Sequence, residues 1–198
     1  MNSRRLLIAF VLLLTTSCTT PKAPAPPSPS PSPSPSGVSI AALRRPWAHP
    51  PIAPGSPCPV TTTLSQPDPG LAALLGDGPA RAAGLAPGAV LEYKSPLEGG
   101  DWIDKTWGGK KVLWAIDPTL TGPVLIRGRQ LDGPGHVAFE DPVMLELVLN
   151  TGSYEGQVGG WKDNPGYTRV RSPGCYAYQI DSERGSSTIV FIARGPVM

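Results

Sequence analysis

Short apolar runs, separated by turns rich in glycine and proline, fill the second half of the chain. In residues 112–116 apolar positions alternate with other residues and Pro118 follows, which is the pattern of a half-buried β-strand. Only residues 71–75 and 79–85 have a weak helical pattern. Further strand-like runs occupy residues 124–131, 137–139, 144–149, 175–180 and 187–193. The spacing predicts an all-β domain built as a sandwich or a barrel.

The start of the chain has a different pattern. Arg4 and Arg5 precede an apolar run from Leu6 to Leu14, and small polar residues then lead to Cys18. The run is too short to cross a bilayer, but it suits the core of an export signal. The arrangement resembles a bacterial lipoprotein signal. This resemblance implies cleavage before Cys18, acyl chains such as palmitate on that cysteine, and a location on the extracytoplasmic face of the cell membrane.

A proline-rich stretch separates this signal from the apolar runs. Residues 21–36 are almost entirely Pro, Ala and Ser, a composition that cannot bury a core and that favours an extended spacer. Proline stays frequent in residues 37–54, which we interpret as a semi-ordered lead-in. The predicted organisation is a signal peptide at 1–17, a lipid-anchored linker at 18–54 and a β-sandwich domain at 55–198.

Cysteine usage refines the expected fold. With lipid on Cys18, Cys58 and Cys175 remain as an even pair in an oxidising compartment, so a disulfide is expected, contributing up to about 5 kcal/mol. A cysteine in the penultimate strand that pairs back to one in an early strand favours an immunoglobulin-like β-sandwich. The segments Pro173-Gly174-Cys175-Tyr176 and Val190-Phe191 also resemble the end of small secreted bacterial domains, which implies a fold and no activity.

Charge argues against a nucleic-acid partner. The chain has 17 basic and 15 acidic residues, and removal of the signal takes away two arginines and no acidic residue. The mature chain is therefore neutral, without the basic stripe of a nucleic-acid binder. The densest basic clusters are the pairs 44–45 and 110–111, which we interpret as solvated surface.

One motif suggests an enzyme. Ser172-Pro173-Gly174-Cys175 is similar to the Ser-His-Gly-Cys signature of L,D-transpeptidases, which implies a cell-wall-modifying enzyme with Cys175 as nucleophile and His136 as its base. Pro173 stands where that family has histidine, and Cys58 would lack a partner, so the disulfide is the preferred interpretation. The two histidines and the acidic turns have neither zinc-site nor EF-hand spacing, and no metal or cofactor is expected.

The candidate binding residues are aromatic and basic. Trp102, Trp107 and Trp161 fall in polar, Gly-rich segments, where they either stack on sugars or a protein partner or cap the ends of the sandwich. Arg127 and Arg129 share a strand face and either contact anions or pair with a nearby carboxylate. We expect a binding or structural module at the cell envelope, without enzymatic activity, whose partner is cell-wall glycan or an envelope protein. The alternative is the cysteine enzyme.

Overall fold

The chain folds almost entirely into β-strands, which confirms the predicted all-β class. The computed structural model describes residues 37–66, 69–70, 72–85, 87–96, 102–150, 156–158 and 160–198. The predicted signal peptide, the lipidation site Cys18 and the spacer up to residue 36 lie outside these ranges. No helix in the described ranges is long and apolar enough to cross a membrane.

One short helix and twelve strands occupy the described residues. Helix α1 (Ile40–Leu43) is capped by Ser39, whose hydroxyl accepts a hydrogen bond from the backbone N–H of Ala42 at 3.3 Å. The strands are β1 (Leu64–Ser65), β2 (Leu74–Leu75), β3 (Ala80–Ala83), β4 (Val90–Glu92), β5 (Gly108–Ile116), β6 (Val124–Gln130), β7 (His136–Phe139), β8 (Glu146–Leu149), β9 (Gly156–Val158), β10 (Trp161–Val170), β11 (Gly174–Ser182) and β12 (Gly185–Arg194).

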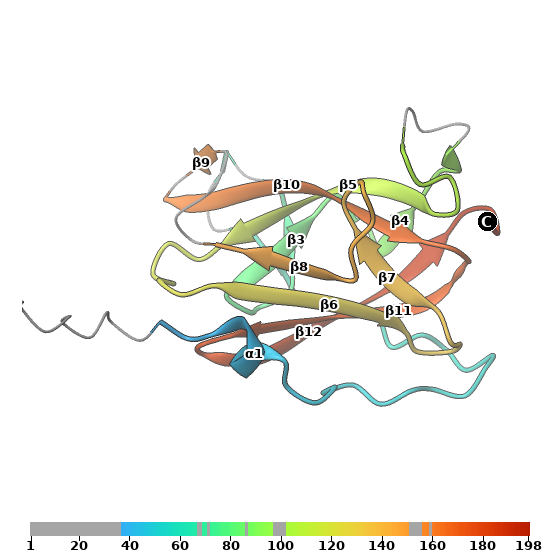
Figure 1. Cartoon of the computed structure of the whole chain (residues 1–198), viewed down its shortest axis with the longest axis horizontal. Coiled ribbons are helices and arrows are strands. Elements are labelled where there is room, and N and C mark those ends of the chain that lie inside the picture. Colours follow the sequence, from blue (N-terminus) through green and yellow to red (C-terminus); the bar gives the residue numbers. More distant parts are fainter. Residues whose placement is uncertain are drawn as a thin grey trace, which may run out of the picture. The chain divides into compact units, whose positions relative to one another are not determined.

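The strands form one continuous sheet that curls on itself, as Figure 1 shows. Their order is β1-β2-β3-β5-β10-β7-β6-β11-β12-β4, with β8 paired to β6 and β9 paired to β10. The short strand β7 joins the two halves because it pairs with β10 on one side and with β6 on the other. Strands β4 and β12 run parallel, and the other pairs between described strands are antiparallel.

The concave side of the curl holds the main hydrophobic core. Alternation within β5 places Trp114 in this core, whereas its neighbour Ala115 packs with a separate cluster on the other face. The Trp114 ring meets the Tyr178 ring edge-on at 5.0 Å, and Tyr178 stacks on Phe191 at 4.5 Å. The Tyr178 hydroxyl is satisfied by that of Thr168 at 2.8 Å. The two halves of the sheet therefore share one aromatic centre.

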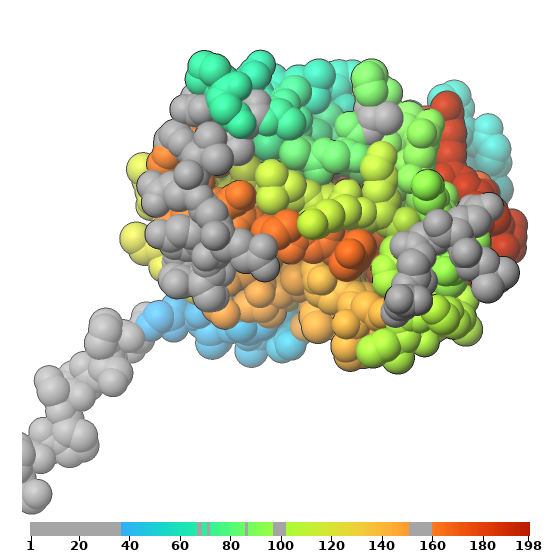
Figure 2. Space-filling model, turned by 90° about the horizontal axis from the view of Figure 1, so that it is seen from above, coloured from blue at the N-terminus to red at the C-terminus, as the bar shows by residue number. Residues whose placement is uncertain are grey.

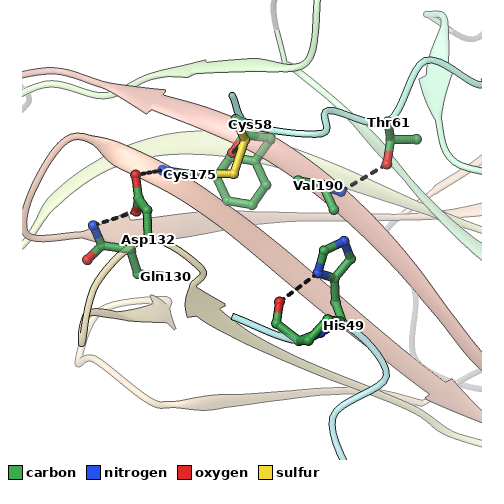
Figure 3. The surroundings of a disulfide bond; sticks show 9 residues. His49, Cys58, Thr61, Gln130, Asp132, Cys175 and Val190 are labelled. Carbon is green, nitrogen blue, oxygen red and sulfur yellow. Dashed lines mark hydrogen bonds between the residues drawn. A yellow bond between two sulfur atoms is a disulfide. The ribbon is translucent and has the colours of Figure 1, made fainter. Parts of the chain in front are cut away.

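The lead-in covers the opposite face of the second half of the sheet. Leu43 of α1 is fully buried, and the backbone N–H of Ile52 donates to the Leu131 carbonyl at 2.8 Å. Further along, the predicted disulfide joins Cys58 to Cys175 across a sequence separation of 117 residues (Figure 3). Residues 37–54, which the composition set apart from the domain, thus pack against it and belong to the same compact unit.

Two expectations about local structure are wrong. Residues 71–75 and 79–85 were expected to have some helical character, but they contain β2 and β3, because pairing of β3 with β5 outweighs the helix propensity of its alanines. In addition, Cys58 lies outside any strand, so the disulfide ties an extended segment to β11 and does not pin two sheets together. The described strands follow one curled path, and an immunoglobulin-like arrangement stays a prediction.

Candidate functional site

The three tryptophans singled out by the sequence are largely buried, and each lies beside an arginine. Trp102, Trp107 and Trp161 are 8%, 7% and 8% exposed, which fits side chains that cap the edges of the domain. The guanidinium groups above their rings belong to Arg169 at 4.1 Å, Arg171 at 4.4 Å and Arg81 at 4.7 Å, respectively. These cation–π contacts cover ring faces that a sugar would need for stacking.

Arg127 and Arg129 hold the lead-in on the sheet. Their guanidinium groups both lie over the ring of Trp47, at 5.0 and 4.8 Å from its centroid. Arg127 also forms an ion pair with the buried carboxylate of Asp181 at 2.7 Å, and Arg129 donates to the backbone carbonyl of His49. Carboxylate pairing was the simpler of the two interpretations for Arg127, and the geometry agrees with it.

One sequence-predicted residue, Trp102, lines a groove of about 410 Å³. Strands β5 and β10, which form part of this groove, lie side by side on the face shown in Figure 2 (yellow-green and orange). The residues that line the groove come from four separate stretches of the chain. They are Glu92, Tyr93, Lys94, Trp102, Gly109, Lys110, Lys111 and Tyr167, which we call the lysine groove.

The lysine groove is built around a close approach at Gly109. Gly109 and Lys94 exchange two backbone hydrogen bonds, at 3.0 and 3.1 Å, which joins the segment after β4 to the start of β5. A Cβ atom at Gly109 would lie 2.6 Å from the side chain of Arg169 and 2.8 Å from that of Trp102, so glycine is required. Trp102 in turn meets the Tyr167 ring edge-on at 5.9 Å. The aromatic wall of the groove is therefore fixed against the sheet.

Arg169 packs against the ring of Trp102 and fixes its position in this wall. Its buried guanidinium donates to the carbonyl oxygens of Trp107 (2.8 Å), Asp104 (2.9 Å), Glu140 (3.2 Å) and Gly108 (3.3 Å). Burial lowers the pKa of Arg169, and neighbouring carboxylates oppose this effect, but an arginine remains protonated. The cation thus fixes the loop that carries Trp102.

Asp141 is the nearest of these carboxylates, 3.6 Å from the Arg169 guanidinium. Desolvation raises the pKa of Asp141, but hydrogen bonds from the backbone N–H groups of Ile103 and Asp104, together with the charge of Arg169, outweigh this effect. Its pKa therefore lies below the ordinary value, and the carboxylate stays ionised near neutral pH.

The charge of the lysine groove is positive. Lys94 and Lys111 are exposed and Lys110 is half-buried, against a single carboxylate on Glu92. Burial raises the pKa of Tyr93 to about 12, and its hydroxyl donates to the Pro196 carbonyl at 2.6 Å, so this side chain is a neutral part of the wall. Such a set of groups can attract and hold an anion.

The other sequence-predicted chemistry lies elsewhere. Cys175 is bonded to Cys58, so in this state it has no thiol to act as a nucleophile, and His136 is an exposed residue at the start of β7. No group of three or more potential metal ligands occurs among the described residues. The sequence indicated Trp102 but missed the other groove residues; the adjacent lysines 110–111 were the one available signal, and we had interpreted them as solvated surface.

Comparison with known proteins adds no assignment. The chain matches no protein-family model, and neither a curated protein nor a solved structure shows significant similarity to it.

Proposed function

We propose that this chain is a binding module on the extracytoplasmic face of the cell membrane, attached by lipid on Cys18, and that the lysine groove binds an anionic cell-wall glycan. The observation that carries the proposal is that Lys94 and Lys111 line the groove beside the wall of Trp102 and Tyr167, and Lys111 lies directly opposite Tyr167 in the β5–β10 ladder. A mature chain of zero net charge that places two exposed lysines in one groove has a local charge suited to carboxylate- or phosphate-bearing sugars.

The geometry also indicates how binding would work. Because Arg169 covers one face of Trp102, the ring cannot serve as an open stacking platform. The aromatic side chains instead form a rigid apolar wall, and the lysine ammonium groups supply the attraction. Charge attraction at an exposed site is screened over a Debye length of about 8 Å at physiological ionic strength. Affinity is therefore expected to fall as salt is added.

The test uses residues 37–198, which contain every described strand, the core and the disulfide. We expect this fragment to bind oligogalacturonate in calorimetric titration and to ignore its methyl ester, which has the same sugar backbone without the charge. The double variant Lys94→Ala/Lys111→Ala should weaken binding at least tenfold. The matched control is Lys105→Ala, which removes an exposed lysine outside the groove. Equal affinity for the ester, or equal loss in the control, would contradict the proposal.

The proposed attachment has its own test. Replacing Cys18 by serine should abolish incorporation of radiolabelled palmitate into the chain in a bacterial host. Undiminished labelling of the serine variant would contradict lipid attachment at this residue.

A further inference from the structure

The curled sheet leaves an opening near its two ends. Strands β1 and β4 end the hydrogen-bonded path and are not paired with each other. A segment before β1 bridges part of this distance, because the backbone N–H of Thr61 donates to Val190 of β12 and the carbonyl of Thr63 accepts from Gly76 after β2, both at 2.9 Å. The remaining space is a pocket of about 490 Å³.

This pocket, which we call the seam pocket, reaches the main core. Its floor is formed by Leu75, Ala82 and Ala89, which belong to the buried core cluster, and Val60 and Leu85 pack against that cluster from the sides. The other lining residues are Thr61, Thr62, Leu64, Ala72, Ala73, Gly84, Pro87 and Gly88. Leu64 at the rim is 63% exposed, so apolar surface continues from the core to solvent.

Small side chains create the space. Six of the lining residues are alanine or glycine, and Ala82 faces the core directly opposite Trp114 of β5. None of the lining residues that the structure describes is charged or aromatic. Of the two hydroxyl groups, that of Thr61 already accepts the backbone N–H of Val190 at 2.9 Å, and Thr62 is exposed at the rim. The described side chains of the pocket therefore offer a ligand few hydrogen-bonding groups.

We propose that the seam pocket binds a single unbranched acyl chain. An acyl chain has no polar group along its length, which matches a lining without charge. A peptide in the same place would leave its backbone N–H and C=O groups without partners, at a cost in free energy. The polar head of the ligand would stay in water beside Thr62. No residue of the seam pocket lines the lysine groove, so this inference stands independently of the proposed function.

The test measures binding of dodecanoate, below its micelle concentration, to delipidated residues 37–198. We expect one dodecanoate per chain. The variant Ala82→Leu fills the floor and should lower the affinity at least tenfold. Because a floor variant can fail to fold, Ala73→Glu places a charge at the exposed rim and should have the same effect on affinity. The matched control is Leu145→Ser, which removes an exposed leucine (53%) outside the pocket.

Several results would overturn the acyl-chain proposal. They are the absence of saturable binding, unchanged affinity in Ala73→Glu, a loss as large in Leu145→Ser, and tighter binding of the rigid aromatic probe naphthalene than of dodecanoate. The folded rim and floor variants should still bind oligogalacturonate as the parent does, which keeps the two proposals separable.

Discussion

Replacing Arg169 tests whether one buried cation organises the loop next to the lysine groove. The variant Arg169→Met keeps a long side chain but removes the guanidinium hydrogen bonds to the four carbonyl oxygens. The Trp107 carbonyl belongs to a buried residue outside the strands, whereas Gly108 is also paired with Val170 in the β5–β10 ladder. Asp104 and Glu140 are half-buried and can regain water. A buried acceptor that loses its donor costs about 1–3 kcal/mol.

The buried Trp107 carbonyl, the Asp141 carboxylate left without its cation and the lost contact with Trp102 predict a decrease of about 3–5 kcal/mol in the free energy of unfolding, the range seen when a buried ion pair loses one partner. Arg169→Lys keeps the charge but loses the planar fork that reaches several carbonyls at once, so we expect a loss of about 1–3 kcal/mol.

The assay is urea unfolding of residues 37–198, followed by tryptophan fluorescence. The matched control is Arg171→Met, because Arg171 is exposed and stacks on Trp107 at 4.4 Å without a buried network. Arg171→Met should lower the free energy of unfolding by less than about 1 kcal/mol. A loss of less than about 1 kcal/mol in Arg169→Met, or equal losses in the two methionine variants, would refute the stabilising role of the buried cation.

Three further predictions concern the disulfide, the buried hydroxyl pair of Tyr178 and Thr168, and the ion pair between Arg44 and Glu146 at 2.9 Å. Serine in place of both disulfide cysteines should lower the free energy of unfolding by up to about 5 kcal/mol, measured against the parent with and without reductant. Tyr178→Phe should cost about 1–2 kcal/mol by leaving the Thr168 hydroxyl unsatisfied, and adding Thr168→Val should recover part of this loss. The pKa of Glu146 lies below its ordinary value, mainly because Arg44 donates hydrogen bonds to the carboxylate. Desolvation opposes this shift, and the positive charge of Arg44 adds to it. The contribution of this pair to the free energy of unfolding should be complete at pH values above the unfolded-state pKa of Glu146, about 4.3. It should be lost as the pH falls through the folded-state pKa of Glu146, so Arg44→Ala should flatten this part of the stability–pH curve.

The sequence predicted those strands in which buried apolar residues alternate with other residues or follow one another without interruption. The runs at 112–116 and 175–180 fall within β5 and β11, because alternating or continuous apolar residues are sufficient to indicate a buried strand. Strand β10 escaped prediction because Asn164, Pro165 and Gly166 are typical of a turn. Within the described ladders, β10 pairs with β5 over residues 162–170, whereas β9 and β7 pair only with the two ends of β10. Proline is tolerated there because its nitrogen can point away from the β5 partner.

The candidate site was less predictable than the fold. Trp102 attracted attention as an aromatic residue in a polar segment, but Tyr167 and Lys94 become its neighbours only when β10 and the segment after β4 reach β5. A local sequence pattern does not indicate which distant segments come into contact in the folded chain. The sequence also could not show that Arg127 and Arg129 are already occupied by the lead-in, because Trp47 lies 80 or more positions before them.

The disulfide determines how the domain would resist a pulling force at its N-terminal side. Residues 37–57 are held by hydrogen bonds and side-chain packing, which can be peeled away one contact at a time. This releases roughly 70 Å of extended chain, at about 3.4 Å per residue. At Cys58 the peeling stops, because the covalent bond transfers the load to β11, a strand clamped between β6 and β12. Further extension requires shearing two antiparallel ladders together, so the crosslink works as a mechanical stop that protects the core.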